Sequence, residues 1–408
     1  MRILYECDLA GSSFHGMAYR IFQFSTEFKK RGHEVLIVAA SYSHVRRVNP
    51  DVKNALTDEY VEGIKYKWIR TPKYNGSGIG RVLHMIVYNT RLWYYAGRIA
   101  REFRPEVVIS SGVTPLDFIG CHRIAKKAGA RKFLEVGDLW PLTPVELGNF
   151  SPKHPFIRFM QYAEDFAYSN TDGVISLLPC AESYMIKHGL KSGRFHYIPN
   201  GIVMEDWIET AELPNEHFVK INELRGQNKF LIGFTGTHSI SNALDTLLLV
   251  AKQLENTRAE FILVGDGPVK NELIRTANEM GIRNISFLPQ IRKNAIPAFL
   301  TEMDALYIGF QKSSLYRFGV SPNKIFDYMM SGKPIIQAIE AGNNLVKEAG
   351  CGVYSEPGNV EEISFAIKEI ISFSPDKLSQ LGSNGKKFVT ENHSYDILTN
   401  KFLKVLEN

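Results

Sequence analysis

Short runs of apolar residues recur along this chain, and each run leads into a small-residue or glycine-bearing loop and then into a helical pattern. Residues 35–40, 107–109 and 261–264 are three of these runs. Their lack of polar alternation is typical of strands that are buried on both faces in a parallel sheet. Strands that alternate with helices require right-handed crossovers, so we predict an α/β fold of two doubly wound, Rossmann-like domains that face each other across a cleft.

The length of the chain, 408 residues, suits two domains of about 200 residues each. A polar interval at residues 205–229 interrupts the alternation, and we interpret it as the connection between the domains. The predicted domains are therefore residues 1–204 and residues 205–388. We expect the last segment, residues 389–408, to form a helix that crosses back to the first domain.

The cysteine content and the N-terminus indicate a cytoplasmic protein. The four cysteines show no paired spacing, so they predict neither a disulfide scaffold nor a zinc site. Residues 2–5 have the pattern of a strand that enters a glycine loop, rather than that of a signal peptide. The chain contains no run of eighteen apolar residues, the length that a membrane-spanning helix needs.

One segment near the C-terminal end combines helix signals with charge. Ser321 followed by Pro322 is typical of a helix N-cap and a first helical residue. The free N–H groups of Asn323 and Lys324 would then point out of the positive end of the helix, where phosphate binds. Asp327, one turn further along the helix, is suited to accept hydrogen bonds from both hydroxyls of a ribose. The alternative is an ordinary capped helix with a lysine–aspartate pair on its surface.

Glycine-bearing loops follow predicted strands in both halves, at the edge of the sheet where α/β proteins bind ligands. Glycine lets the backbone approach a ligand closely, although an ordinary turn remains the alternative. The candidate loop residues are Gly11, His15 and Gly16 in the first half, and Gly236, Thr237, His238, Gly265 and Gly267 in the second. Of the two histidines, His15 is the stronger candidate for contact with the reacting atoms.

Asp138 also follows a predicted strand, and with its neighbour Glu135 it is a candidate general base; a helix cap or a strand-end salt bridge is the alternative for either residue. Lys270 stands where a dinucleotide-binding fingerprint would have its third glycine, which disfavours a NAD-dependent dehydrogenase. The sequence contains no Asp-x-Asp and no spaced histidine or cysteine cluster. We therefore expect neither a metal nor a cofactor, and no nucleic-acid partner.

Several short motifs, each weak alone, occur in a specific order along the chain. They are Gly32-His33-Glu34-Val35, residues 135–141, Pro199-Asn200-Gly201-Ile202, residues 264–268 and residues 321–334. With these motifs the chain resembles, nearly end to end, the retaining, metal-independent family-4 glycosyltransferases of GT-B fold. Residues 18–20 and 39–44 make it similar to transferases that build cell-envelope glycans, including N-acetyl-L-fucosamine transferases.

The resemblance implies transfer of a sugar, an N-acetylhexosamine, from a UDP-sugar to a hydroxyl of a lipid-linked glycan, with retention at the anomeric carbon. It assigns the ribose-binding role to Asp327, while Gly319 stands where the family has a second carboxylate for the donor sugar. Thr237 and Asn242 stand where many members have cations against the diphosphate. Lys324 then remains as the cation for the phosphates.

One departure from the family pattern concerns the first domain. Relatives commonly have histidine or arginine directly before Asp138, where this chain has Gly137. This departure leaves open a loss of activity or a role for His15. The expected catalytic residues are accordingly His15, Asp138 and Lys324. A sugar or sugar-phosphate synthase of the same fold, and a catalytically silent protein that binds a sugar nucleotide, are the alternatives.

Residues 64–101 contain basic and large apolar side chains, and no acidic residue occurs between Glu62 and Glu102. Within this stretch, residues 64–68 alternate and predict a half-buried strand with a basic outer face. Basic and aromatic residues together suit an anionic membrane surface, so a peripheral position on the inner face of the membrane is a hypothesis. The alternative is a helix that covers the sheet of the first domain.

Overall fold

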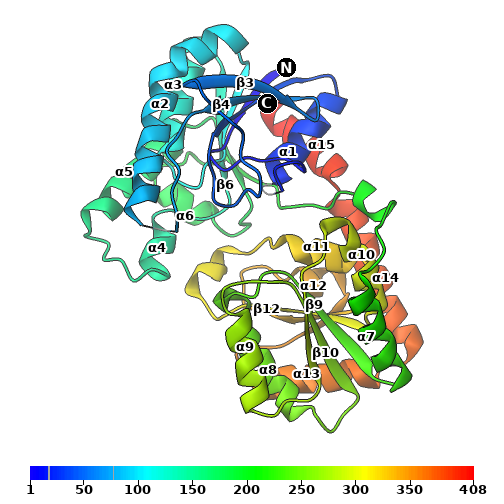
Figure 1. Cartoon of the computed structure of the whole chain (residues 1–408). Helices are drawn as coiled ribbons and strands as arrows, with labels where there is room; N and C mark the ends of the chain where they lie inside the picture. The colour runs from blue at the N-terminus through cyan, green and yellow to red at the C-terminus, as the bar shows by residue number, and fades with distance from the viewer. Residues whose placement is uncertain (17–18, 77) are drawn as a thin grey trace. The chain divides into compact units, whose positions relative to one another are not determined.

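The computed structural model describes residues 1–16, 19–76 and 78–408. The chain forms two compact units, the first made of Met1–Pro199 with Tyr395–Asn408 and the second of Asn200–Ser394 (Figure 1). Each unit is a Rossmann-like α/β domain with a largely parallel sheet, which confirms the predicted fold class. The chain passes between the units at 199/200 and 394/395, a few residues from the boundaries that the sequence suggested.

The first unit is built around an eight-stranded sheet in the order β3-β4-β2-β1-β5-β6-β7-β8. The pair β3–β4 is antiparallel, and the other neighbouring strands are parallel. The strands are β1 Arg2–Glu6, β2 Glu34–Ala40, β3 Leu56–Val61, β4 Ile64–Ile69, β5 Val107–Ser110, β6 Arg131–Val136, β7 Gly173–Ser176 and β8 Phe195–Tyr197. The segments that follow β1, β5 and β6 therefore meet at one edge of the sheet.

The helices of the first unit include the last helix of the chain. They are α1 Tyr19–Lys30, α2 Ile79–Phe103, α3 Asp117–Ala128, α4 Leu142–Glu146, α5 Pro155–Asn170, α6 Glu182–Lys187 and α15 Tyr395–Glu407. In Figure 1, α15 lies beside α1, and both chain ends belong to this unit. The ring of Phe402 on α15 meets the ring of Phe24 edge-on at 4.9 Å and that of Phe28 at 5.4 Å. An aromatic cluster thus joins the two ends of the chain.

The second unit contains a parallel sheet in the order β11-β10-β9-β12-β13-β14. Its strands are β9 Phe230–Thr235, β10 Ala259–Val264, β11 Ile285–Leu288, β12 Ala305–Gly309, β13 Ile335–Ala338 and β14 Gly352–Tyr354. Its helices are α7 Asn215–Gly226, α8 Leu244–Gln253, α9 Lys270–Glu279, α10 Ile296–Glu302, α11 Asn323–Met330, α12 Leu345–Ala349, α13 Val360–Ser372 and α14 Pro375–Asn392, with the 3-10 turns η1 Glu205–Trp207, η2 Ile240–Asn242, η3 Lys293–Ala295 and η4 Ser314–Phe318. Because η1 and α7 lie inside this unit, the interpretation of residues 205–229 as an interdomain connection is wrong.

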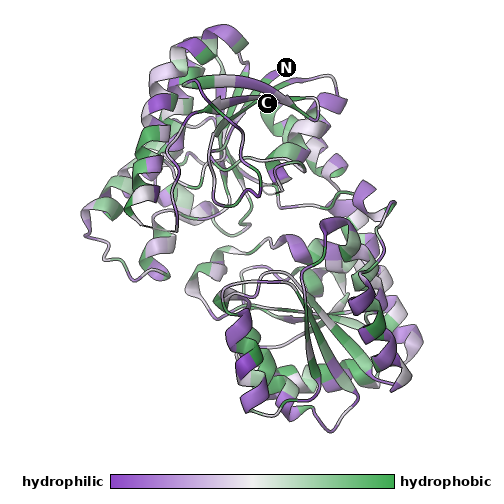
Figure 2. Cartoon of the chain, in the orientation of Figure 1, coloured by the Kyte–Doolittle hydropathy of each residue, from purple (hydrophilic) through white to green (hydrophobic). Residues whose placement is uncertain are grey.

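Both faces of the second sheet are buried, which explains the continuous apolar runs. Leu231 and Ile262 belong to the hydrophobic core on one face, and Ile232 and Phe261 belong to the core on the other. Figure 2 shows that the strands of this sheet are predominantly hydrophobic. Successive side chains of a strand point to opposite faces of the sheet. When helices cover both faces, every side chain of the strand is buried, so polar residues do not alternate with apolar ones.

The predicted basic outer face of β4 is wrong. Lys67 is buried, and its ammonium group forms ion pairs with Asp58 on β3 and, at 3.0 Å, with Glu102 on α2. Lys65 also pairs with Asp58, at 3.2 Å. Acidic residues of β3 and α2 thus pair with Lys67, which the sequence suggested would face water. Among the described residues, no helix combines the length and the apolar character needed to cross a membrane.

Candidate active site

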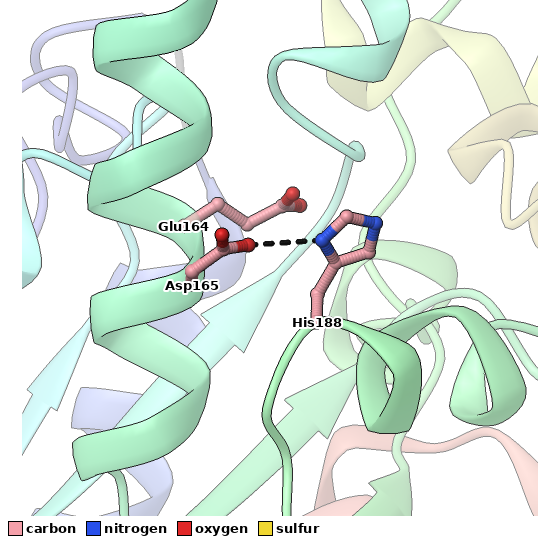
Figure 3. A group of neighbouring side chains, drawn as sticks. All are labelled: Glu164, Asp165 and His188. Atoms are coloured by element: carbon pink, nitrogen blue, oxygen red, sulfur yellow. Dashed lines mark hydrogen bonds and ion pairs between the residues drawn. The ribbon is translucent and has the colours of Figure 1, made fainter.

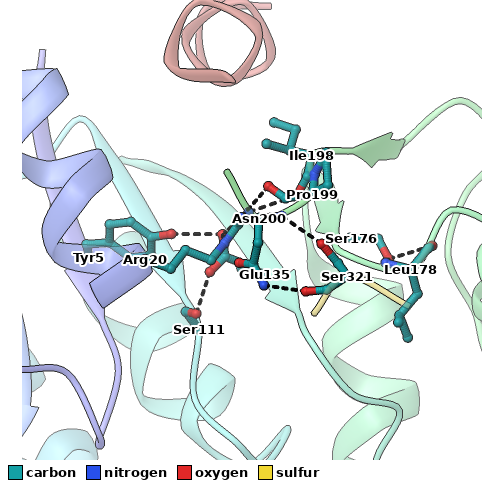
Figure 4. Close-up of polar contacts among 10 residues, drawn as sticks. All are labelled: Tyr5, Arg20, Ser111, Glu135, Ser176, Leu178, Ile198, Pro199, Asn200 and Ser321. Atoms are coloured by element: carbon teal, nitrogen blue, oxygen red, sulfur yellow. Dashed lines mark hydrogen bonds and ion pairs between the residues drawn. The ribbon is translucent and has the colours of Figure 1, made fainter. Parts of the chain in front are cut away.

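The helix α11 begins at Asn323, after Pro322, which has φ −71° and ψ 128°. The predicted N-cap is therefore wrong by one residue. The hydroxyl oxygen of Ser321 accepts a hydrogen bond from the backbone N–H of Asn200 at 2.9 Å, and its carbonyl oxygen accepts one from the Asn200 side-chain amide at 2.7 Å (Figure 4). Ser321 therefore bonds to Asn200 in the segment that precedes the helix, and its hydroxyl does not cap the first N–H groups of α11.

Lys324 places its ammonium group beside the loop that follows β9. Its Nζ donates to Oδ1 of Asn242 at 2.9 Å and lies 4.2 Å from the centre of the Phe234 ring. A Cβ on Gly236 would lie 3.0 Å from this Nζ, so the glycine makes room for the amine. Burial lowers the pKa of Lys324 to about 7. Thr237 is exposed, and its carbonyl oxygen accepts from the Asn242 amide at 2.9 Å.

The other glycine loops of this unit pack against each other. A Cβ on Gly265 would lie 1.9 Å from the Gly236 carbonyl oxygen, and a Cβ on Gly267 would lie 2.3 Å from the His238 carbonyl oxygen. His238 is fully buried, and neither ring nitrogen has a hydrogen-bond partner among the residues that the structure describes. Burial lowers its pKa to about 4. The approach of the two loops accounts for these glycines without a ligand, and the donor-binding role of the loops stays a prediction.

Asp327 lies deeper along α11 and is partly buried. Burial raises the pKa of its carboxyl group to about 6, while the nearby ammonium group of Lys293 acts in the opposite direction. Lys293 forms an ion pair with Asp206 at 2.5 Å, and Asp206 adds to the increase for Asp327. The carboxylate of Asp327 is thus available as a hydrogen-bond acceptor, mainly above pH 6. Its role toward a ribose stays a prediction.

In the first unit, Asp138 and Gly137 are exposed at a cavity of about 190 Å³ beside the carboxyl ends of β5 and β6. The surrounding protein removes part of the water from Asp138 and so raises the pKa of its carboxyl group. A Cβ on Gly137 would meet only the Leu177 side chain, at 3.9 Å, among the described atoms beyond its chain neighbours. Packing therefore does not explain a glycine at this position.

Glu135 forms a salt bridge at the end of its strand, which was the alternative to a role as general base. Its Oε2 lies 3.0 Å from the Arg20 guanidinium group and accepts from the Tyr5 hydroxyl at 2.8 Å. Its Oε1 accepts from the hydroxyl of Ser111 at 2.6 Å (Figure 4). Arg20 also donates to the Pro199 carbonyl oxygen at 2.6 Å. These bonds occupy both oxygens of Glu135, so it is a structural residue.

His15 is enclosed by aromatic side chains. It is 1% exposed, and its ring meets Trp68 edge-on at 5.3 Å, while Nδ1 lies 2.9 Å from the Ser12 hydroxyl. Burial, together with the charge of Arg46, lowers the pKa of His15. The neutral imidazole is thus packed within the first unit. Contact with a substrate stays a prediction that needs this loop to move.

One of the two candidate glycines beside His15 has a structural explanation in this loop. Gly16 has φ +78°, and a Cβ there would lie 3.0 Å from Cδ of Arg47. Gly11 is buried, and its carbonyl oxygen accepts from the Tyr66 hydroxyl at 2.9 Å, a bond that does not itself require glycine. Residues 17 and 18, which follow, lie outside the described residues.

Two domain families match the chain in succession. The family described as Glycosyl transferase 4-like domain matches residues 15–201, and the family described as Glycosyl transferases group 1 matches residues 229–372. The first match falls almost entirely in the first unit and the second in the second unit. Both units thus match glycosyltransferase domain families, and the chain is a glycosyltransferase.

This glycosyltransferase has curated relatives at low identity. It is 26% identical over 358 residues to "Putative colanic acid biosynthesis glycosyl transferase WcaI" of Escherichia coli (strain K12), covering 84% of this chain and 85% of that one. It is 23% identical over 334 residues to "Probable glycosyltransferase WbjE" of Pseudomonas aeruginosa, covering 80% and 78%.

Solved structures share its GT-B fold. Sucrose-phosphate synthase from Thermosynechococcus elongatus matches with a TM-score of 0.72 at 14% identity, covering 100% of this chain and 98% of that one. HepE from Anabaena in complex with UDP matches with a TM-score of 0.68 at 15% identity, covering 100% of both. At these identities the likeness concerns the fold.

The glycosyltransferase also contains a group of potential metal ligands that sequence spacing did not reveal. Glu164 and Asp165 on α5 lie beside His188, whose Nδ1 is 2.9 Å from Oδ1 of Asp165 (Figure 3). Glu164 is buried and already accepts from the hydroxyls of Tyr184 at 2.9 Å and Tyr168 at 3.2 Å. Internal hydrogen bonds therefore account for this group. Sequence spacing did not reveal the group because the fold joins residues far apart in sequence, and the absence of a bound metal stays a prediction.

Proposed function

We propose that this glycosyltransferase moves a sugar from a UDP-sugar to an acceptor hydroxyl, with retention at the anomeric carbon. The observation that carries the proposal is the amine of Lys324, which lies beside Gly236 and has the neutral amide of Asn242 as its hydrogen-bond partner. A diphosphate would supply the negative charge that this site lacks, and the first N–H groups of α11 add positive potential. The HepE structures with UDP and with UDP-glucose support the choice of nucleotide.

The chemical requirement is stabilisation of the leaving diphosphate. When the bond from the anomeric carbon to the phosphate oxygen breaks, negative charge grows on that oxygen. In the proposal, Lys324 and the backbone N–H of Asn323 stabilise this charge, and Asp327 holds the ribose. These groups take the place of a divalent ion, so the proposed reaction is metal-independent. Asp138 and His15 of the first unit are the proposed contacts to the sugar and the acceptor.

The proposed donor carries an N-acetylhexosamine, and the proposed acceptor is a lipid-linked glycan. Support comes from the resemblance to cell-envelope transferases and from the colanic acid biosynthesis in the printed name of one relative. The test is transfer of radiolabel from a set of UDP-sugars to a lipid extract, with and without EDTA. We expect labelled lipid in both cases. Label in a free sugar phosphate would indicate a synthase, and neither transfer nor hydrolysis would indicate a silent binding protein.

We further propose that the N-terminal half of α2 docks on an anionic lipid surface. Large apolar side chains are exposed on this helix: Ile79, Val82, Leu83, Ile86, Trp93 and Tyr94. Lys73 is exposed and Arg81 half-buried near the start of the helix, and Arg91 follows on it. Lys67 and Arg98 do not belong to the docking charges, because Glu102 pairs with both. The proposal therefore rests on a smaller basic set than residues 64–101 suggested.

A further inference from the structure

The exposed side of α2 is apolar along the N-terminal half of the helix. Four large apolar side chains are exposed there: Ile79, Val82, Leu83 and Ile86. Their spacing of i, i+3, i+4 and i+7 places them on one side of the helix. An amphipathic helix that lies in a groove of a partner presents its apolar side chains with this spacing. The row is therefore suited to contact another protein surface.

The charges beside this apolar row are positive. Arg81 lies within the row and Arg91 follows it on the same helix, and no acidic residue occurs between Glu62 and Glu102. Neither arginine forms an ion pair with a carboxylate in the described part of the chain. A complementary surface should therefore be apolar and carry acidic groups at its border.

The second unit contains a groove of this kind between α8 and α9, which lie side by side in Figure 1. The groove has a volume of about 400 Å³. The buried side chains of Leu244, Leu248 and Leu273 contribute to its lining. Ile240 and Leu249 also line it and are exposed, so apolar surface reaches the solvent there.

The charges of this groove are negative. Asp245 on α8 and Glu272 on α9 line it and are exposed, and no basic residue lines it in the described part of the chain. The basic residues of both helices have other partners: Lys252 pairs with Glu255 at 3.0 Å, Arg275 with Glu279 at 3.8 Å, and Lys270 donates to the Gly265 carbonyl oxygen at 2.7 Å. Among the described residues, Asp245 and Glu272 form no ion pair, so the basic groups of a partner can approach them.

We propose that two copies of this chain associate through these two features, with the N-terminal half of α2 of one copy lying in the α8–α9 groove of the other. The apolar row covers the leucines of the groove, and the two arginines lie near Asp245 and Glu272. The occupant is a second copy because both halves of the complementary pair occur on one chain. A dimer with two-fold symmetry contains the contact twice.

The association is independent of the proposed sugar transfer and of the proposed lipid contact. It uses the face of α2 that we propose for the lipid surface. A copy whose α2 lies in a groove therefore cannot dock on lipid through the same helix.

Sedimentation equilibrium of the full chain over a range of concentrations measures the association. Leu83→Glu places a negative charge in the apolar row, and Leu249→Lys places a positive charge in the groove. Each substitution removes an exposed apolar contact and adds repulsion from the charges of the other copy. The matched controls are Ile186→Glu, at an exposed position of α6 in the first unit, and Phe365→Lys, at an exposed position of α13 in the second. Chemical denaturation checks that all four variants stay folded.

A mixture of the two variants distinguishes the proposed contact from other ways of pairing. The Leu83→Glu chain keeps its groove, and the Leu249→Lys chain keeps its apolar row. The mixture can therefore form one contact although each variant alone lacks half of the pair. Pairing of two α2 faces with each other would instead be lost in Leu83→Glu and unaffected by Leu249→Lys.

We expect the average mass of the unchanged protein and of both controls to rise with concentration toward that of a dimer. Leu83→Glu and Leu249→Lys should each weaken association by about tenfold, and their equimolar mixture should associate more tightly than either variant alone. Association should also weaken as salt rises, because the paired charges are exposed. A protein that stays monomeric at every concentration overturns the proposal. So does association that Leu249→Lys leaves unchanged, or a mixture that associates no better than its components.

Discussion

A partly enclosed cation is present in each unit, and the two are held differently. Arg20 in the first unit bonds to the Glu135 carboxylate and to two carbonyl oxygens, those of Pro199 and Ile198. Lys324 in the second unit bonds to the amide oxygen of Asn242. Burial opposes the charge of Arg20, but the interactions with Glu135, Tyr5 and Tyr395 together outweigh the effect of burial, and the pKa of Arg20 is raised. Burial lowers the pKa of Lys324 to about 7.

This difference separates a structural cation from one that is available to a ligand. The charge of Arg20 is compensated within the protein, so no anion is required to stabilise it. The charge of Lys324 is not compensated by a carboxylate among the residues described, and its ammonium form would gain from an incoming anion. Substitution of Arg20 should therefore lower folding stability, whereas substitution of Lys324 should lower the rate of catalysis.

The largest expected effect is on stability. Arg20→Met leaves the Glu135 carboxylate buried without its cation, so the free energy of unfolding of the first unit should fall by about 3–5 kcal/mol. Chemical denaturation measures the change. Arg275→Met, which breaks an exposed pair with Glu279, is the control and should cost less than about 1 kcal/mol. A loss for Arg20→Met as small as that of the control would contradict the structural role.

Lys324→Met should lower kcat by roughly 10²–10³-fold, the range for loss of one group that stabilises transition-state charge, with a smaller effect on donor KM. Folding stability should not fall, because the substitution removes a desolvated ammonium group. Steady-state kinetics and denaturation test both statements. The control is Lys347→Met, an exposed lysine of α12. Unchanged kcat would show that another group, such as Arg292 or Lys293, neutralises the phosphates.

Asp327→Ala should weaken UDP binding by about 1.5–3 kcal/mol, the range for hydrogen bonds to a charged group. Calorimetry measures the affinity, and the exposed Asp376→Ala serves as the control. If the folded Asp327→Ala protein binds UDP as tightly as the unchanged protein, the ribose does not contact this carboxylate.

The affinity for UDP-glucose should depend on pH through Lys324. Its pKa is about 7 without ligand and should be higher beside a diphosphate, because negative charge favours the ammonium form. Below pH 7 Lys324 is protonated in both states, so the affinity is constant down to about pH 6, where the Asp327 carboxyl group begins to take up a proton. Above pH 7 binding takes up a proton, so the affinity should fall by up to about tenfold per pH unit until the pKa of the complex is passed. Equal calorimetric enthalpies in buffers of different ionisation enthalpy would contradict this, and Lys324→Met should remove the dependence.

The smallest effects are expected at the proposed lipid surface, where each basic residue contributes about 1 kcal/mol. Lys73→Gln, Arg81→Gln and Arg91→Gln should each reduce cosedimentation with anionic vesicles, and binding should fall as salt rises. Arg98→Gln is the matched control, since Glu102 already pairs with Arg98 at 2.7 Å. Equal recovery with neutral and anionic vesicles would exclude electrostatic docking.

The sequence predicted the two α/β domains because a buried parallel strand has a local signature, a continuous apolar run. It did not predict contacts between distant segments. Asn200, 121 residues away in sequence, donates a hydrogen bond to the Ser321 hydroxyl, which therefore does not act as the predicted helix cap. The helix begins at Asn323 instead of Pro322. Lys67 has the spacing of an exposed residue, yet its partners come from β3 and α2.

A cavity of about 470 Å³ in the first unit illustrates the same limit, with one exception. His84 and Thr114 come from different elements, and only the fold brings them together in its lining. Asp8, however, follows the first strand just as Asp138 follows β6. The rule that ligands bind at the carboxyl ends of parallel strands selected Asp138 and applies equally to Asp8. The acidic residue could thus have been found from the sequence, but its neighbours could not.

The packing of α15 against α1 has a consequence for synthesis on the ribosome. Phe24 and Phe28 are made before the second unit, but Phe402, which packs against them, is made after it. At translation rates of about 5–20 residues per second, synthesis of the whole second unit takes about 10–40 s, during which this aromatic surface is uncovered. The first unit therefore completes its packing only after the second unit has been synthesised. A nascent chain that stops before residue 395 exposes an apolar aromatic surface to chaperones and proteases.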